Sequence, residues 1–141
     1  MKTVKNMVAL AFLGILMAIS VAKAQTTKVD FGKNEYQAKC ANCHGPDGRG
    51  NGPYSDLLSV QTPNLSTLAK NNGGIFPIER LYQSISGEKI KAHGSRDMPI
   101  WGQVYRMDAA NYYIDIPYDP EGYSRTRLLA LLEYLYRIQV K

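Results

Sequence analysis

Both cysteines of this chain and one of its two histidines lie in the stretch Cys40-Ala41-Asn42-Cys43-His44. Four kinds of site use a C-x-x-C pair: a structural disulfide, a redox-active dithiol, a zinc site and a covalently attached haem. A disulfide between cysteines so close in sequence would restrict the unfolded chain very little. A redox dithiol of this spacing belongs beside a βαβ unit, which the sequence does not show. Zinc needs four ligands, and only His93 remains to complete the set.

Covalent haem attachment accounts for all three residue types at their spacing. Each thiol adds to one vinyl group of the porphyrin, and two intervening residues let one turn of chain reach both vinyl groups. The next residue then lies beneath the ring, where an imidazole nitrogen can bind the iron. The sequence therefore predicts one covalent haem c, with Cys40 and Cys43 as its attachment points and His44 as an iron ligand.

The second iron ligand is sought further along the chain, in the segment HGSRDMPIWG. Met98 lies 54 residues beyond His44, among polar and glycine residues, and Pro99 stiffens the segment after it. Methionine is more often a core residue than a ligand, and Met107 and His93 are rival candidates. Histidine–methionine ligation raises the reduction potential and suits electron carriers, which favours Met98.

The first 24 residues have the pattern of a secretory signal peptide. Lys2 and Lys5 form a positive start, residues 7–19 are an unbroken apolar run, and small residues at Ala22 and Ala24 suit a signal peptidase. We expect cleavage before Gln25 and a periplasmic protein with no membrane span once the leader is removed. An uncleaved membrane anchor is the alternative, although the 13 apolar residues are short of the roughly 20 that a bilayer requires.

Cleavage would leave residues 25–141 as a single domain of 117 residues. Three of the 17 basic residues are in the leader, so the mature chain carries 14 basic and 12 acidic residues, a net charge of +2. Neither a basic stripe nor a matching motif indicates nucleic-acid binding. The glycines of Gly48-x-Gly50-x-Gly52 do not form a phosphate loop, because no hydrophobic strand precedes them and no Lys-Ser/Thr follows.

The mature chain is predicted to be mostly helical, with three to five helices and long loops. Apolar spacing and capping residues indicate helices over about 31–43, over about 77–86, and from a cap at Asp119 through Ile138, with a further turn over about 63–69. The alternation around residues 112–116 has no hairpin partner, so no strand pair is expected. Long loops in a small domain need something to fill the middle, and a large apolar cofactor would do so.

These features together resemble class I c-type cytochromes, over about residues 31–139. The closer likeness is to small exported bacterial monohaem cytochromes, and four segments carry it: CHGPDGRGNGP, PNLSTLAKNNGGIFP, HGSRDMPIWG and YDPEGYSRTRLLALLEYL. The resemblance implies a cytochrome c fold wrapped around one covalent haem, with His44 and Met98 as the axial ligands. It also implies that a proline carbonyl after the Gly-rich loop orients the proximal imidazole, and Pro53 matches that position, with Pro63 as the alternative.

The resemblance assigns further residues to the fold and to the haem. Gly32, Tyr36 and Tyr134 match the close crossing of the first and last helices. Trp101 and Arg96 are candidates for contacts with the haem propionates, although each also has an ordinary interpretation, as a packed ring and as a solvated charge.

Residues 103–119 depart from the shortest family members and are rich in tyrosine. We expect this segment to pack on its own domain, and a docking surface is the alternative. The lysines Lys39, Lys89 and Lys91 could steer an acidic partner, but a net charge of +2 does not support strong steering.

The expected function is electron transfer rather than catalysis. A periplasmic monohaem cytochrome would pass single electrons between redox proteins such as a dehydrogenase and a terminal oxidase, freely or as a subunit. The alternative is a haem enzyme or gas-binding sensor with a labile distal methionine, in which His93 and Arg96 would form a minimal acid–base pair. A non-haem binding domain with a disulfide is a third interpretation.

Overall fold

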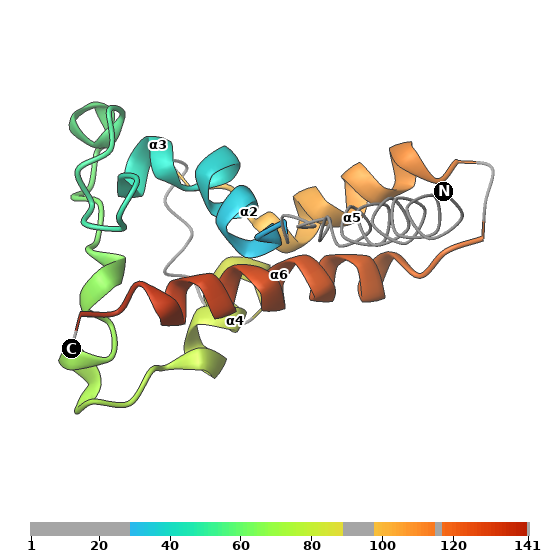
Figure 1. Ribbon diagram of the computed structural model, residues 1–141. Coiled ribbons are helices and arrows are strands. Elements are labelled where there is room, and N and C mark those ends of the chain that lie inside the picture. Colours follow the sequence, from blue (N-terminus) through green and yellow to red (C-terminus); the bar gives the residue numbers. More distant parts are fainter. Residues whose placement is uncertain (1–28, 89–97, 115–116, 141) are drawn as a thin grey trace, which may run out of the picture.

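Residues 29–88, 98–114 and 117–140 are described by the computed structural model (Figure 1). The predicted leader, His93 and Arg96 lie outside these ranges. The described residues contain no strand, which agrees with the prediction of a mostly helical domain. The α-helices are α2 (Phe31–Lys39), α3 (Ala41–His44), α4 (Ile78–Ser86), α5 (Trp101–Tyr112) and α6 (Pro120–Arg137), and the 3-10 helices are η1 (Ser55–Leu57), η2 (Leu65–Thr67) and η3 (Lys70–Asn72).

Helix α6 is the central element of the core. It begins where predicted, because the Asp119 side chain accepts a hydrogen bond from the Glu121 backbone N–H and Pro120 occupies the first turn. Figure 1 shows α6 between α4 on one side and α2 and α5 on the other. The apolar residues whose spacing predicts this helix are buried between them, and those in the core are Leu128, Leu131, Leu132 and Leu135.

Helices α2 and α6 cross at a close contact that only glycine allows. A Cβ added at Gly32 would collide with the backbone carbonyl of Ala130. Next to this contact, the rings of Tyr36 and Tyr134 lie 5.1 Å apart between their centroids, and both residues are buried. The crossing expected from Gly32, Tyr36 and Tyr134 is therefore confirmed.

The first predicted helix is divided in two at Cys40. This residue ends α2, where its N–H donates to the Tyr36 carbonyl, and its own carbonyl accepts from the N–H of His44 at 2.9 Å. Helix α3 then ends at Gly45, whose φ of 81° is open to glycine at little cost. The short helix thereby holds Cys43 and His44 one turn beyond Cys40.

Helix α4 matches the predicted segment 77–86, with Gly87 as its left-handed C-cap. The predicted turn over 63–69 is present as the 3-10 helices η2 and η3, and the second of them ends at Gly73 with φ 65°. Helices α4 and η3 thus both end at a glycine in the left-handed conformation, a common way for a helix to end.

Helix α5 was not predicted. It packs against α6 and α4, and its contact face is formed by Gly102, Tyr105 and Ala109. Gly102 lies against the backbone of Ser86, and its carbonyl accepts a hydrogen bond from Ser124. Figure 1 shows α5 and α6 side by side along the part of the molecule farthest from α3. Residues 103–112, more than half of the segment 103–119, thus belong to a packed helix.

Candidate haem-binding site

A cavity of about 270 Å³ opens between α3, α4, α6 and the segment that contains Met98. Its volume is close to the lower end of the range of small-molecule pockets, about 300–1,000 Å³, so its chemistry identifies it better than its size. Cys40, His44 and Met98 lie on its walls. The apolar part of the lining is Leu65, Leu68, Leu81, Ile85, Leu131 and Leu135. A thiol, an imidazole and a thioether in an apolar cavity fit a covalently bound haem.

The Gly-rich loop closes against the backbone of α3 and holds the motif in place. The N–H of Gly50 donates to the carbonyl of His44 at 2.7 Å, and the N–H of Gly52 donates to that of Cys43 at 3.0 Å. A Cβ at Gly52 would meet the carbonyl of Asn42. The loop glycines therefore donate hydrogen bonds to carbonyls that the end of a helix leaves without partners. The sequence analysis excluded a phosphate loop for these glycines but did not predict this role.

A proline carbonyl orients the ring of His44. Its Nδ1 lies 3.1 Å from the carbonyl oxygen of Pro63. Because a carbonyl oxygen can only accept, this hydrogen bond places the proton on Nδ1 and leaves the lone pair on Nε2, the form that binds iron. His44 is buried, with 7% of its surface exposed, so the ring is held by its surroundings as well.

The proline that meets His44 is the alternative considered above, and the first choice, Pro53, is wrong. Pro53 is exposed, between two residues whose N–H groups donate to carbonyls of α3, Gly52 to Cys43 and Tyr54 to Asn42. The loop is thus still attached to the α3 backbone at Pro53. It returns to the imidazole only at Pro63, which lines the cavity.

The surroundings of Cys40 favour a neutral sulfur. Burial raises the pKa of the Cys40 thiol to about 12, and the nearby carboxylate of Glu35 adds to the effect. Redox-active and metal-binding cysteines need the thiolate, which a raised pKa disfavours. A thioether carries no charge, so a buried, apolar position suits the product of haem attachment.

The two methionine candidates occupy different environments. Met98 is half-buried and lines the cavity that His44 lines. Met107 is 59% exposed on α5. Of these two, only Met98 is on the wall of the cavity.

The residues expected near the propionates are not on the described cavity wall. Trp101 is half-buried, and the ammonium nitrogen of Lys39 lies 5.5 Å from the centroid of its ring. Arg96 is outside the described residues. The wall instead carries Arg80 and Ser84, one turn apart on α4, which the sequence interpretation missed. They adjoin Leu81 and Ile85 of the same helix on this wall, and no signal in the sequence shows that this side of α4 meets the cavity.

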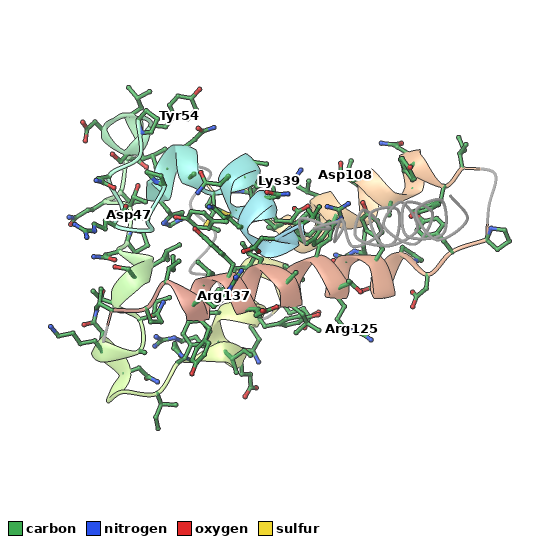
Figure 2. The ribbon with its side chains drawn as sticks, viewed as in Figure 1. Lys39, Asp47, Tyr54, Asp108, Arg125 and Arg137 are labelled. Carbon is green, nitrogen blue, oxygen red and sulfur yellow. The ribbon has the colours of Figure 1, made fainter. Side chains whose placement is uncertain are left out.

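A buried ionic cluster behind Cys40 joins three helices. The hydroxyl of Tyr105 donates to a carboxylate oxygen of Glu35 at 2.9 Å, and the guanidinium of Arg127 forms an ion pair with the other oxygen. Burial and the carboxylate raise the pKa of Tyr105 well above its ordinary value. Nearby, Lys39 of α2 and Asp108 of α5 form a surface ion pair at 3.4 Å (Figure 2). These contacts fix α2, which carries Cys40 at its end, against α5 and α6.

The tyrosines of residues 103–119 divide between the core and the surface. Tyr105 is 1% exposed, whereas Tyr112 is 78% exposed. Tyr113 packs its ring against Tyr118 and Tyr123, at centroid distances of 4.9 and 6.0 Å. Packing on the chain's own domain is confirmed for Tyr105, Tyr113 and Tyr118.

Comparison with known families agrees with this site. Residues 27–113, more than half of the chain, match the family described as cytochrome c oxidase, cbb3-type, subunit III. No curated protein and no solved structure matches the chain significantly. Within the described ranges, no helix is long and apolar enough to cross a membrane. The matched region includes the C-x-x-C-H motif and Met98, and the chain therefore belongs to this family of class I c-type cytochrome domains, whose activity is haem-based electron transfer.

Proposed function

We propose that the mature chain is an exported monohaem cytochrome that carries single electrons between redox proteins, with its iron bound by His44 and Met98. The observation that carries the proposal is that these two side chains lie on the walls of one cavity, and that the remaining lining is largely apolar. Such a cavity excludes water and limits the rearrangement that accompanies a change of charge.

Each residue of the site has a separate role in this proposal. Cys40 and Cys43 hold the porphyrin by thioether bonds, and His44 donates its Nε2 lone pair while the Pro63 carbonyl fixes its ring. Met98 would supply the second iron ligand. The bound haem would supply reversible exchange of one electron between Fe(II) and Fe(III). A histidine and a methionine as iron ligands are typical of electron carriers, which favours a carrier over an enzyme.

Export and redox partners complete the proposal. The family match begins at residue 27, shortly after the predicted cleavage site at Ala24, which supports a leader that precedes the domain. The family description names an oxidase subunit, so a terminal oxidase is one partner class, with a dehydrogenase as the donor. The chain would act as a free carrier or as the cytochrome subunit of such a complex.

The test is to export the chain in a host with intact cytochrome assembly machinery and to record mass and spectra of the purified protein. We expect the denatured protein to retain the mass of one haem. The reduced form should show the sharp bands of low-spin haem c, and the oxidised form should show the near-infrared sulfur-to-iron band. The bare polypeptide mass would refute the proposal. A high-spin spectrum with rapid carbon monoxide binding would instead favour the haem enzyme or gas sensor.

A further inference from the structure

Two polar side chains of α4 face the cavity and have no role in the proposed function. Arg80 and Ser84 are one helical turn apart, so they lie on the same face of α4, and both line the cavity. Ser84 is 7% exposed. Arg80 is an exposed residue, so its side chain lies at the mouth of the cavity, where the wall meets solvent.

Neither side chain has a partner within the described part of the chain. No hydrogen bond or ion pair is formed by the Arg80 guanidinium or the Ser84 hydroxyl there. Glu79, which precedes Arg80 in the chain, instead accepts a hydrogen bond from Gln83. Ser84 is more than nine-tenths buried as a residue, but its hydroxyl oxygen is not one of the fully enclosed side-chain atoms that lack a partner, so it remains open to the cavity. A hydroxyl open to an otherwise largely apolar cavity can bond a polar group of the ligand.

The charge of the wall indicates what that group is. Arg80 is the only permanently charged residue among those described along the cavity, and the contacts from α6 are made by Leu131 and Leu135. In the proposed function, Cys40, His44 and Met98 are committed to the porphyrin and its iron. A cation at the mouth and a hydroxyl behind it remain, and together they suit a carboxylate, for which the arginine fork is the preferred partner.

We propose that Arg80 and Ser84 form the binding site for a haem propionate, so that this edge of the haem lies against α4 at the mouth of the cavity. The inference rests on the proposed function, since it requires a haem in the cavity. It assigns a propionate contact to residues other than Arg96 and Trp101, the contacts expected from the sequence. By pairing with the propionate, Arg80 keeps that carboxylate ionised and offsets its charge near the iron.

The test compares holoproteins that carry Arg80→Gln, Arg80→Lys or Arg125→Gln. Arg125 is the matched control, because it is an exposed arginine that extends away from α6 (Figure 2) and does not line the cavity. The denatured mass of each protein is measured first. If no variant and no wild-type protein carries haem, the proposed function itself fails, and this outcome is distinct from a failure at Arg80.

For the haem-loaded proteins, the reduction potential is measured from about pH 5 to pH 8, and the propionate is titrated by NMR in the ferric form. Loss of the cation stabilises the more positive Fe(III) state, so Arg80→Gln should raise the ratio of oxidised to reduced protein about three- to tenfold at a fixed potential near neutral pH. The upper value corresponds to about 59 mV for one electron. The propionate pKa should rise, and the potential should become more dependent on pH. Arg80→Lys should recover most of the potential, since it keeps the charge.

The proposal is overturned if Arg80→Gln, with its haem attached, has the same potential and propionate titration as Arg125→Gln. Ser84→Ala tests the second residue. We expect it to raise the propionate pKa by less than Arg80→Gln does and to leave the near-infrared band in place. A Ser84→Ala protein with an unchanged propionate titration would remove Ser84 from the site.

Discussion

His44 is held by contacts from both ends of the loop that follows it. Its backbone carbonyl accepts from Gly50, and its ring nitrogen Nδ1 bonds the carbonyl of Pro63. The loop thus fixes the position of the residue and the rotation of its ring. In metal sites such an outer hydrogen bond sets the tautomer and makes the imidazole a better donor to the metal. In the proposed function, the loop would accordingly prepare the imidazole as a ligand.

Met98, the proposed second iron ligand, is the subject of the prediction at the scale of single residues. In the holoprotein, Met98→Ala should abolish the near-infrared sulfur-to-iron band and lower the reduction potential by at least the equivalent of a tenfold change in the oxidised-to-reduced ratio, about 59 mV. Thioether ligation favours Fe(II), so its loss favours Fe(III). Redox titration with spectroscopy measures both effects. Met107→Ala is the control, because Met107 is 59% exposed, and loss of the sulfur band in that variant would contradict the choice of Met98.

Contiguous residues of the site could be predicted from sequence, and residues brought together by the fold could not. The motif Cys40 to His44 occupies one turn of chain, so its geometry follows from its spacing alone. The choice between Pro53 and Pro63 depends on where the loop returns to the ring, which local sequence does not encode. Arg80 and Ser84 were missed for a similar reason, since only the packing of α4 against α6 shows which of its faces meets the cavity.

At the scale of elements, α5 replaces what was expected to be an irregular segment. Its contact face has one large side chain, Tyr105, beside Gly102 and Ala109, so the apolar periodicity of an amphipathic helix is weak. The alternating residues near its end resemble a strand instead. Tertiary contacts with α6 and the close approach of Gly102 to Ser86 stabilise this helix, and neither can be read from the segment itself.

At this scale we predict how strongly the ion pair between Glu35 and Arg127 stabilises the packing of α2 on α6. Glu35 of α2 is buried, and removing its cation leaves a carboxylate whose only remaining side-chain partner among the described residues is Tyr105. Arg127→Leu should therefore lower the free energy of unfolding of the holoprotein by about 2–4 kcal/mol, a little below the range for fully buried pairs because the Arg127 side chain is 24% exposed. Denaturant titration followed by circular dichroism measures the change.

A different ion pair, which joins α5 to α6, provides the matched control for this substitution. Arg106 and Glu121 are 3.5 Å apart, and their side chains are 36% and 59% exposed. Arg106→Leu should cost less than about 1 kcal/mol, as expected for solvent-exposed pairs. If the two substitutions lower the free energy of unfolding equally, burial of Glu35 does not strengthen its ion pair.

Two buried tyrosines connect these elements across the whole molecule. Tyr36 packs on Tyr134 at the α2–α6 crossing and donates its hydroxyl hydrogen to the carbonyl of Gly45, at the end of the haem-binding motif. Tyr105 joins α5 to Glu35 of α2. Burial is the main cause that raises the pKa of both hydroxyl groups above their ordinary value of 10.0. The same residues that close the core therefore make its stability sensitive to alkali.

In the folded protein both tyrosines keep their protons at pH values where the unfolded chain loses them. The stability that this provides is fully present below about pH 10 and decreases as the pH rises above it, by about 1.4 kcal/mol per pH unit for each tyrosine. Denaturant titrations of the holoprotein between about pH 8 and pH 11, followed by far-ultraviolet circular dichroism, should show this decline.

The variant Tyr105→Phe should roughly halve the slope of the free energy of unfolding against pH, although it also removes the hydrogen bond to Glu35 and lowers stability at every pH. Tyr112→Phe, at a position 78% exposed, should leave the slope unchanged. If a protein that carries both Tyr36→Phe and Tyr105→Phe has the same slope as the wild-type protein, groups other than these two hydroxyls control alkaline unfolding.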